Sequence, residues 1–305
     1  ADGSTINLKS GLTFTGTAAA DSVVGTSMAD TLAGVGGNDA LQGGAGSDSY
    51  KFSVGDGVDT ISETSGAADT ILMGAGITAA NIRFEKSSYD LNIYYGTSDK
   101  ITLYSQFYDD MRGSSSLDEV ETLKFADGST INLKSGLTFT GTATTDSVAG
   151  TNMADTLVGL AGDDYLYSYG GDDVLIGGTG NDTLSGGAGS DTYKFSVGDG
   201  VDAIYEQSGA ADVVLMGTGI TASNIRFEKS GTNLNIYYGA SDKITIYSQF
   251  YDDANATSSF DEVETLKLAD GSTINLKSGL TFTGTATADS VAGTNMADTL
   301  VGLAG

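Results

Sequence analysis

The chain has 305 residues and a formal net charge of −26, from 40 acidic and 14 basic residues. This balance excludes nucleic acid and anionic membrane as partners, because both require basic patches. The sequence contains no His and no Cys, which excludes the usual zinc sites, imidazole and thiol catalysis, and disulfide bonds. No apolar run approaches the ~20 residues of a membrane-spanning helix, and no signal peptide is expected at residue 1.

A long repeat organises the chain from its first residue. The phrase ADGSTINLKSGLTFTGTA occurs at residues 1–18, 126–143 and 269–286. The chain therefore divides into unit one (1–125), unit two (126–268) and the start of unit three (269–305). Unit one has 125 residues and unit two has 143, a difference of 18. Both chain ends fall inside the repeat pattern, which predicts an excerpt from a longer array.

A shorter repeat of nine residues begins at residue 16 in unit one and at residue 141 in unit two. Glycines crowd the first four places of the regular nonapeptides, Asp holds the sixth place and an apolar residue holds the eighth. In unit one the sixth place is held by Asp21, Asp30, Asp39 and Asp48, and in unit two by Asp146, Asp155, Asp164, Asp173, Asp182 and Asp191. This G-G-x-G-x-D-x-U-x pattern is typical of a parallel β-roll that binds calcium.

The spacing predicts the geometry of such a roll. Glycine adopts positive φ without steric cost, so the first six residues form a tight turn, and the last three form a short strand with an inward apolar side chain. Two nonapeptides then complete one coil of 18 residues, which equals the length difference between the units. We expect Asp164 to lie over Asp182 on one edge, and Asp173 over Asp191 on the other. Carboxylates stacked at ~4.8 Å repel one another unless a cation lies between them, and oxygen ligands favour Ca²⁺.

These repeats resemble the repeats-in-toxin (RTX) haemolysin-type calcium-binding family of secreted proteins. The resemblance implies that each ion sits between consecutive turns on the same edge, held by Asp carboxylates and by carbonyl groups of the glycine positions. The glycines at those positions are Gly34, Gly36, Gly37, Gly43, Gly44 and Gly46 in unit one, and Gly159, Gly162, Gly170, Gly171, Gly177, Gly178, Gly180, Gly186, Gly187 and Gly189 in unit two.

The first two nonapeptides of each unit are degenerate, because their fourth place is Ala19, Met28, Thr144 or Met153 instead of Gly. Such residues would strain a left-handed turn. We therefore interpret these nonapeptides as caps that start the roll and bind calcium weakly or on one side only. Unit three opens with the same pair, which contains Asp289 and Asp298.

After Tyr50 and Tyr193 the strict period is lost, but the D-x-U signature continues. It predicts one more coil with enlarged turns and four further candidate ligands, Asp59, Asp69, Asp202 and Asp212. The GDG segments at 55–57 and 198–200 could donate further carbonyl ligands. An acidic loop without an ion is the alternative for this coil.

Strand-like segments follow at 82–84, 91–95, 101–107, 120–125 and 131–133, and residues 77–82 could form one helical turn. Along 101–107 apolar and polar residues alternate, which predicts a half-buried strand. The block resembles the haemolysin-type calcium-binding-related domain. The predicted fold is therefore all-β, with β-rolls that alternate with small β-rich connectors. Its segments are the end of a preceding unit (1–15), roll 1 (16–72, nonapeptides 16–51), connector 1 (73–140), roll 2 (141–215, nonapeptides 141–194), connector 2 (216–283) and the start of roll 3 (284–305).

Other candidate chemistry is sparse. Acidic pairs at 109–110, 118–119, 252–253 and 261–262 could serve a glycosidase as acid and base, but neighbouring side chains point apart. Tyrosines at 94–95, 104, 108, 237–238, 247 and 251 could grip a sugar, although packing of a sheet face is the more usual role. Neither the H-E-x-x-H zinc helix nor the G-x-S-x-G elbow is present.

We therefore predict a non-enzymatic, calcium-dependent extender or scaffold of a large secreted bacterial surface protein, such as an adhesin, a surface layer or a matrix fibre. Multiple Ca²⁺ ions are its expected cofactors, and neighbouring units of the same chain are its expected partners, with self-assembly into a fibre or layer left open. The expected location is extracellular, at the bacterial surface, after export through a narrow channel. The alternative is the export-and-folding module of a secreted enzyme or toxin. Carbohydrate binding through the tyrosines is a weaker third reading.

Overall fold

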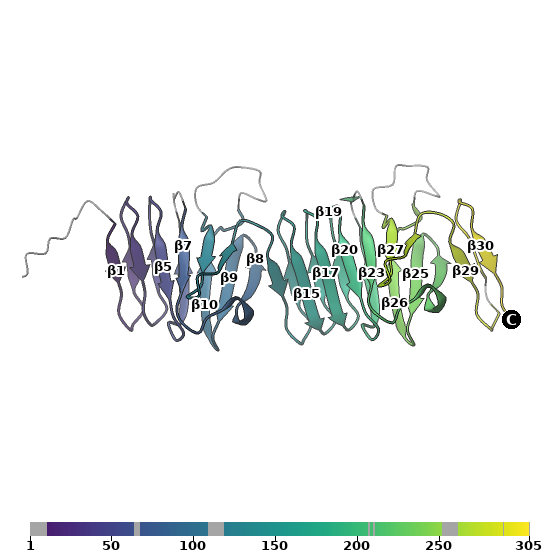
Figure 1. Cartoon of the computed structure of the whole chain (residues 1–305), viewed down its shortest axis with the longest axis horizontal. Coiled ribbons are helices and arrows are strands. Elements are labelled where there is room, and N and C mark those ends of the chain that lie inside the picture. Colours follow the sequence, from purple (N-terminus) through teal and green to yellow (C-terminus); the bar gives the residue numbers. More distant parts are fainter. Residues whose placement is uncertain are drawn as a thin grey trace, which may run out of the picture. The chain divides into compact units, whose positions relative to one another are not determined.

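The computed structural model describes residues 11–63, 68–108, 119–206, 208–209, 211–251, 262–288 and 290–304, and only the backbone of Ser208–Gly209. The chain divides into two compact units, Ala1–Leu137 and Thr138–Gly305, and each is treated by itself below. Both are built almost wholly of short strands (Figure 1). Within the described residues, no helix is long and apolar enough to cross a membrane.

Unit 1 forms two sheets whose strands alternate along the chain. In the first sheet the strand order is β1 (Thr13–Thr15), β3 (Thr31–Ala33), β5 (Ser49–Phe52), β7 (Thr70–Met73), β11 (Thr122–Lys124) and β12 (Thr130–Asn132). In the second sheet it is β2 (Ser22–Val24), β4 (Ala40–Gln42), β6 (Val58–Ile61), β10 (Asp99–Leu103), β9 (Asp90–Tyr95) and β8 (Arg83–Ser87). A short 3₁₀ turn, η1 (Ala79–Asn81), precedes β8.

Unit 2 repeats this arrangement with one more coil. One of its sheets runs in the order β13 (Thr138–Thr140), β15 (Thr156–Ala161), β17 (Val174–Thr179), β20 (Thr192–Phe195), β23 (Val213–Met216), β27 (Thr265–Lys267) and β28 (Thr273–Asn275). The other runs in the order β14 (Ser147–Ala149), β16 (Tyr165–Tyr167), β18 (Thr183–Ser185), β21 (Val201–Ile204), β26 (Asp242–Ile246), β25 (Asn233–Tyr238), β24 (Arg226–Ser230), β29 (Thr281–Thr283) and β30 (Thr299–Val301). The unit also contains the small pair β19 (Ala188–Gly189) and β22 (Ser208–Gly209), and the turn η2 (Ala222–Asn224).

The strand register confirms a coil of 18 residues. In unit 1, Thr13 pairs with Thr31 and Thr31 with Ser49, in parallel strands and in steps of 18. In unit 2, Tyr165 pairs with Thr183 in the same way. The parallel β-roll expected from the nonapeptides is therefore the observed fold.

Apolar residues at the eighth place of the nonapeptides fill the interior of each roll. Eight of these side chains are at most 1% exposed: Leu32, Leu41 and Tyr50 in unit 1, and Leu157, Leu166, Leu175, Leu184 and Tyr193 in unit 2. Strands such as β3 and β16 contribute one central residue to the core, whereas β5, β7, β20 and β23 contribute two. Packing along the stack of coils therefore holds the rows of turns in place.

The connectors continue both sheets of the roll. β10 pairs parallel with β6, and β11 pairs parallel with β7, so neither sheet ends where the nonapeptides end. β9 and β8 then add antiparallel strands beside β10. The expected strands at 82–84, 91–95, 120–125 and 131–133 correspond to β8, β9, β11 and β12, and the helical turn expected within 77–82 corresponds to η1.

The strand expected over residues 101–107 is too long. β10 ends at Leu103, and Ser105 turns the chain with a φ of 59°. The side chain of Gln106, expected to face outward, is buried instead. Its amide oxygen accepts from the Val120 N–H at 3.0 Å, and its amide nitrogen donates to the Val120 carbonyl oxygen at 2.8 Å. This long-range pair of hydrogen bonds replaces the strand ladder and could not be read from alternation alone.

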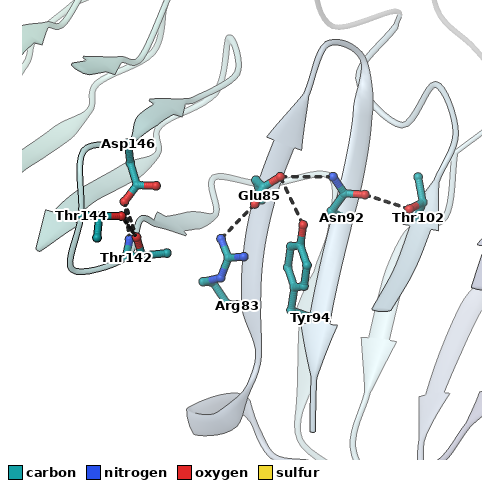
Figure 2. A network of polar contacts seen from close by, with 8 residues as sticks. All are labelled: Arg83, Glu85, Asn92, Tyr94, Thr102, Thr142, Thr144 and Asp146. Atoms are coloured by element: carbon teal, nitrogen blue, oxygen red, sulfur yellow. Dashed lines mark hydrogen bonds and ion pairs between the residues drawn. The ribbon is translucent and has the colours of Figure 1, made fainter. Parts of the chain in front are cut away.

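A polar network ties the three antiparallel strands of connector 1 together (Figure 2). Glu85 accepts from Arg83 at 3.1 Å and from the Tyr94 hydroxyl at 3.3 Å. Asn92 and Thr102, both nearly buried, are joined by a bond of 2.8 Å. Unit 2 repeats the ion pair between Arg226 and Glu228 at 3.0 Å. Such satisfied networks fix the register of a half-buried sheet.

We expect substitution of a central core residue to weaken the roll. Leu184→Ala removes a fully buried side chain from β18 and should lower the free energy of unfolding by about 2–5 kcal/mol. Urea unfolding in saturating calcium measures the loss. Val201→Ala on the neighbouring β21 is the control, because Val201 is 42% exposed. It should change stability by less than ~0.5 kcal/mol, and equal effects of the two changes would contradict the described core.

Candidate metal sites along the two edges of each roll

The sixth-place aspartates form continuous hydrogen-bonded rows, one along each edge of the roll. The backbone N–H of each aspartate donates to the Oδ1 of the aspartate one coil further on, at 2.6–3.0 Å. The first-edge rows are Asp21–Asp39–Asp59 in unit 1 and Asp146–Asp164–Asp182–Asp202 in unit 2. The second-edge rows are Asp30–Asp48–Asp69 in unit 1 and Asp155–Asp173–Asp191–Asp212 in unit 2. The expected stacking of Asp164 on Asp182, and of Asp173 on Asp191, is therefore confirmed.

The second oxygen of most of these carboxylates is buried without a hydrogen bond. Among the described residues this holds for the Oδ2 atoms of Asp39, Asp48, Asp59, Asp69, Asp164, Asp173, Asp182, Asp191, Asp202 and Asp212. A buried charged oxygen without a partner is strongly destabilising. These ten oxygens recur at one position of the coil, which indicates that a cation between the turns is the partner they lack.

Glycines make room for these oxygens and bring carbonyl groups next to them. A Cβ on Gly177, at the first place, would lie 2.2 Å from Oδ2 of Asp182 in the same turn. At the second place, a Cβ on Gly178 would lie 1.9 Å from the carbonyl oxygen of Leu160, one coil earlier. At the fourth place, Gly180 has a φ of 147° and its Cβ would lie 1.8 Å from the Gly162 carbonyl oxygen. Each gap between turns is therefore lined with carbonyl and carboxylate oxygens.

Most of the candidate glycines occupy these crowded places. They are Gly34, Gly43, Gly159, Gly177 and Gly186 at the first place, Gly44, Gly178 and Gly187 at the second, and Gly37, Gly46, Gly162, Gly171, Gly180 and Gly189 at the fourth. The third-place glycines differ, because a Cβ on Gly36 or Gly170 would meet nothing closer than 3.4 Å. Space does not require glycine at the third place.

This oxygen-only donor set fits a hard divalent cation such as Ca²⁺. The unpartnered Oδ2 atoms and the turn carbonyl groups would hold the ion, and its charge would neutralise the carboxylates on either side of each gap. Without His or Cys in the chain, softer metals lack their preferred ligands.

In the degenerate nonapeptides, protein groups instead of a cation satisfy the Oδ2 atom of the aspartate. In each described case, Oδ2 of the Asp accepts from both the backbone N–H and the hydroxyl of a Thr at the second place, at 2.6–2.8 Å. The pairs are Thr17–Asp21, Thr26–Asp30, Thr142–Asp146, Thr151–Asp155 and Thr294–Asp298. Figure 2 shows the Thr142–Asp146 example, in which Thr144 also contacts Thr142. The threonine stands where the other turns lack a partner, and these turns therefore cap the roll.

The strain expected in these turns is absent. Ala19, Met28, Thr144 and Met153 do not have positive φ, so that expectation was wrong. The Thr–Asp bonds close a different turn, which needs no glycine at the fourth place. Non-glycine residues with positive φ occur instead at the second place of regular turns, namely Val35 (85°), Leu160 (85°) and Tyr169 (71°).

The pKa values of the aspartates differ between turns with a Thr–Asp bond and turns without one. Hydrogen bonds from Thr17 hold the pKa of Asp21 below its ordinary value. Burial raises the pKa of Asp48 and Asp164 in the regular turns, and neighbouring carboxylates add to the effect. The pKa rises to about 6 for Asp59, Asp69, Asp182 and Asp191, and to about 7 for Asp173, Asp202 and Asp212. In the absence of a cation these carboxylates therefore bind protons at a higher pH than the aspartates of an unfolded chain.

Acidic residues of the connectors end the second-edge rows and bind the turns near the end of the first edge, and sequence reasoning missed them. On the second edge, the Asp69 N–H donates to Glu121 at 2.6 Å, and the Asp212 N–H donates to Glu264 at 2.7 Å. On the first edge, Asp99 accepts from Gly55 N–H at 2.9 Å. The signal that could have revealed them is their recurrence, in V-E-T-L-K at 120–124 and 263–267 and in S-D-K at 98–100 and 241–243.

The GDG turns bind protein groups through their N–H groups. The N–H groups of Gly55 and Gly57 both donate to the Asp99 carboxylate, at 2.9 and 3.2 Å. The Gly57 carbonyl oxygen accepts from the backbone N–H of Lys100 at 2.9 Å. In unit 2, Gly198 donates to Asp242 at 3.0 Å. The turns at 55–57 and 198–200 therefore bind the starts of β10 and β26, the connector strands that pair with the roll.

The other candidate residues are divided. Asp109, Asp110, Asp118, Asp252, Asp253, Asp261 and Asp289 lie outside the described residues. Glu119 and Glu262 form ion pairs with Lys134 and Lys277, at 2.6 and 2.8 Å. Tyr95 and Tyr238 are buried, whereas Tyr104, Tyr108 and Tyr251 are exposed. The tyrosines thus contribute both to packing and to the surface.

The stacked coils and the oxygen-lined gaps define a cation-binding parallel β-roll. The profile described as RTX calcium-binding nonapeptide repeat (4 copies) matches residues 15–50, 24–61, 140–175, 149–184 and 167–202. The profile of the haemolysin-type calcium binding protein related domain matches residues 93–135. The chain therefore carries RTX calcium-binding repeats followed by this related domain.

Among solved structures, the chain is similar to the extracellular lipase LipA from Serratia marcescens. The identity is 17% and the TM-score 0.32, over 74% of this chain and 37% of the lipase chain. The chain therefore spans little more than a third of that protein. No curated protein sequence matches the chain.

Two matched substitutions should separate cation ligands from caps. Asp182→Asn alters an Oδ2 without a hydrogen-bond partner. It should weaken calcium binding between its turn and the neighbouring turns by at least about 10-fold, because loss of a residue that only hydrogen-bonds to a metal ligand already lowers metal affinity that much. Asp146→Asn, on the same edge, alters an oxygen that Thr142 already satisfies. It should lower stability but leave the calcium stoichiometry unchanged. Isothermal titration with calcium measures both, and identical titrations of the two variants would contradict the division.

The calcium-free chain should be more stable in mild acid than at neutral pH. The raised pKa values mean that the folded chain binds protons more tightly than the unfolded chain, whose aspartates titrate near ~3.9. This contribution is fully present below pH ~4 and is lost as the pH rises through about 6–7, the pKa of Asp182 and Asp202. Thermal melts of calcium-stripped protein between these limits test the sign. A melting temperature that rises with pH across this window would contradict it.

Proposed function

We propose that this chain is a calcium-dependent structural segment, an extender, of a large secreted bacterial surface protein. The observation that carries the proposal is the set of ten buried Asp Oδ2 atoms without hydrogen bonds, which are distributed over both units. Each added copy of a roll and its connector makes the chain longer and adds further cation sites. A scaffold needs length, and the cation sites stabilise the added rolls.

Ion-coupled folding is the proposed mechanism. At low calcium, like charges lie along each edge at ~4.8 Å, so the rolls are destabilised and the chain can pass a narrow export channel unfolded. Outside the cell, sites of extracellular affinity (~10⁻⁴–10⁻³ M) fill, and the binding energy becomes folding energy. The net charge of −26 makes the uncompensated chain strongly self-repelling.

Repetition favours an extender over the alternative of an export-and-folding module behind a catalytic domain. Residues 1–18, 126–143 and 269–286 are identical, and the two complete units share the pattern of rows, caps and connector networks. A secreted enzyme or toxin needs one such module. The full-length open reading frame decides between them: further tandem copies support the extender, and an upstream catalytic domain supports the module.

Calcium removal should unfold the rolls. After exhaustive chelation, circular dichroism should show loss of β signal that returns as calcium rises through about 10⁻⁴–10⁻³ M. Magnesium at equal concentration should not restore the signal, because the smaller ion prefers a rigid octahedral site and sheds water reluctantly. Sodium chloride of matched ionic strength controls for screening of the charges. A chain that stays fully folded in chelator would refute the mechanism and the extender role together.

A further inference from the structure

Each roll ends in a cluster of three buried carboxylates that includes a glutamate outside the nonapeptide pattern. In unit 1 the cluster is Asp48, Glu63 and Asp69, and in unit 2 it is Asp191, Glu206 and Asp212. Within each cluster, one carboxylate oxygen from each residue lies within 4.8 Å of the others. The aspartates are at most 1% exposed, and Glu63 and Glu206 are 8% and 7% exposed.

The clusters occur where the glycine turn is lost. Ser49 pairs with Thr70 and Thr192 with Val213, a step of 21 residues instead of 18. The last second-edge turn therefore reads S-E-T-S-G-A-A-D at 62–69 and Y-E-Q-S-G-A-A-D at 205–212, with no G-G-x-G. The G-G-x-G motif, which brings carbonyl groups to the gaps between regular turns, is therefore missing from this part of the sequence. The second residue of this turn is a glutamate in both units, and the side chain points inward.

Unpartnered oxygens face the same space. The Oδ2 atoms of Asp48 and Asp69, and those of Asp191 and Asp212, are buried without hydrogen bonds. The first-place glycine leaves room for them, because a Cβ on Gly186 would lie 2.2 Å from Oδ2 of Asp191.

A buried tyrosine positions the glutamate. The Tyr193 hydroxyl accepts from the Gly186 N–H at 2.8 Å and donates to Oε1 of Glu206. In unit 1 the Tyr50 hydroxyl accepts from the Gly43 N–H at 2.7 Å in the same way. Both tyrosines are fully buried. In unit 2 the aromatic ring therefore lies next to the cluster, and its hydroxyl orients the third carboxylate.

We propose that these two clusters are roll-terminal cation sites, in which a glutamate side chain takes the place of turn carbonyl ligands. The proposal rests on the calcium-loaded roll of the proposed function. It adds two ligands, Glu63 and Glu206, and an order of filling. Since calcium affinity rises with the number of charged ligands and with site rigidity, a site with three carboxylates binds more tightly than a gap between glycine turns with two. These sites fill first and close the last coil of the roll.

The direct test is anomalous diffraction from the whole chain crystallised with terbium, a hard trivalent probe for oxygen sites. A peak bonded to a Glu206 or Glu63 carboxylate oxygen supports the proposal. Peaks between the glycine turns with none at either glutamate overturn it and leave the proposed function intact. Absence of peaks at both kinds of site defeats both proposals.

A solution test uses terbium luminescence, excited through tyrosine in a chain that has no Trp. The wild-type chain should show a first, tighter phase from the two terminal sites, and the paired Glu63→Gln and Glu206→Gln variant should lose it, with affinity reduced at least about 10-fold. Calcium should still restore its β signal through the remaining sites. The paired Glu85→Gln and Glu228→Gln variant is the control, because both glutamates are half-exposed on the connector sheets.

A second variant pair guards against misfolding. Glu63→Asp with Glu206→Asp retains both charges but withdraws each carboxylate by one methylene, so it should fold and still weaken the first phase. Titrations of the Gln and Asp variants that coincide with that of the wild-type chain would overturn the proposal. Loss of the first phase in the control pair would do the same.

Discussion

The interaction on which each roll depends is the bond from one aspartate N–H to the carboxylate of the aspartate one coil away. It uses one oxygen of every side chain in the row and fixes the orientation of the other. The second oxygen is thereby held, buried, in the gap between two turns. Folding of the backbone and construction of the cation site are therefore the same event, since the N–H group that stacks the coils also aims the ligand.

The degenerate and the regular turns satisfy the second oxygen of the aspartate in different ways. A Thr at the second place donates two hydrogen bonds to the exposed side of the carboxylate, as in Thr142–Asp146. Regular turns have Gly, Val, Leu or Tyr at that place and leave the same oxygen to a cation. The Thr turns stand at the start of each roll, where no earlier coil could complete a gap between turns, so the first coil gains its stability from protein groups alone.

The nonapeptide spacing was sufficient to predict the coil, the stacked aspartates and the core, because period and glycine chemistry act locally. It failed where distant segments decide the outcome. The turn at Ser105 and the buried Gln106 depend on Val120, 14 residues further on. Glu121 and Glu264 end their rows from a distance of 52 residues. The strain expected at Met28 and Met153 was wrong because the Thr two places earlier closes another turn, and only the recurrence of Gly-Thr in every degenerate nonapeptide hinted at it.

The repeat at residues 126–268 is 18 residues longer than the repeat at residues 1–125, and the register absorbs this difference as one complete coil. Such an insertion brings two strands, two core side chains and one carboxylate for each edge, while the caps and the connector stay unchanged. Insertion or deletion of 54 nucleotides therefore changes the length of the roll by one coil and changes the number of carboxylates that need a cation at the same time. Gain or loss of whole coils by recombination between neighbouring copies therefore changes the length of the roll and keeps the register of both sheets.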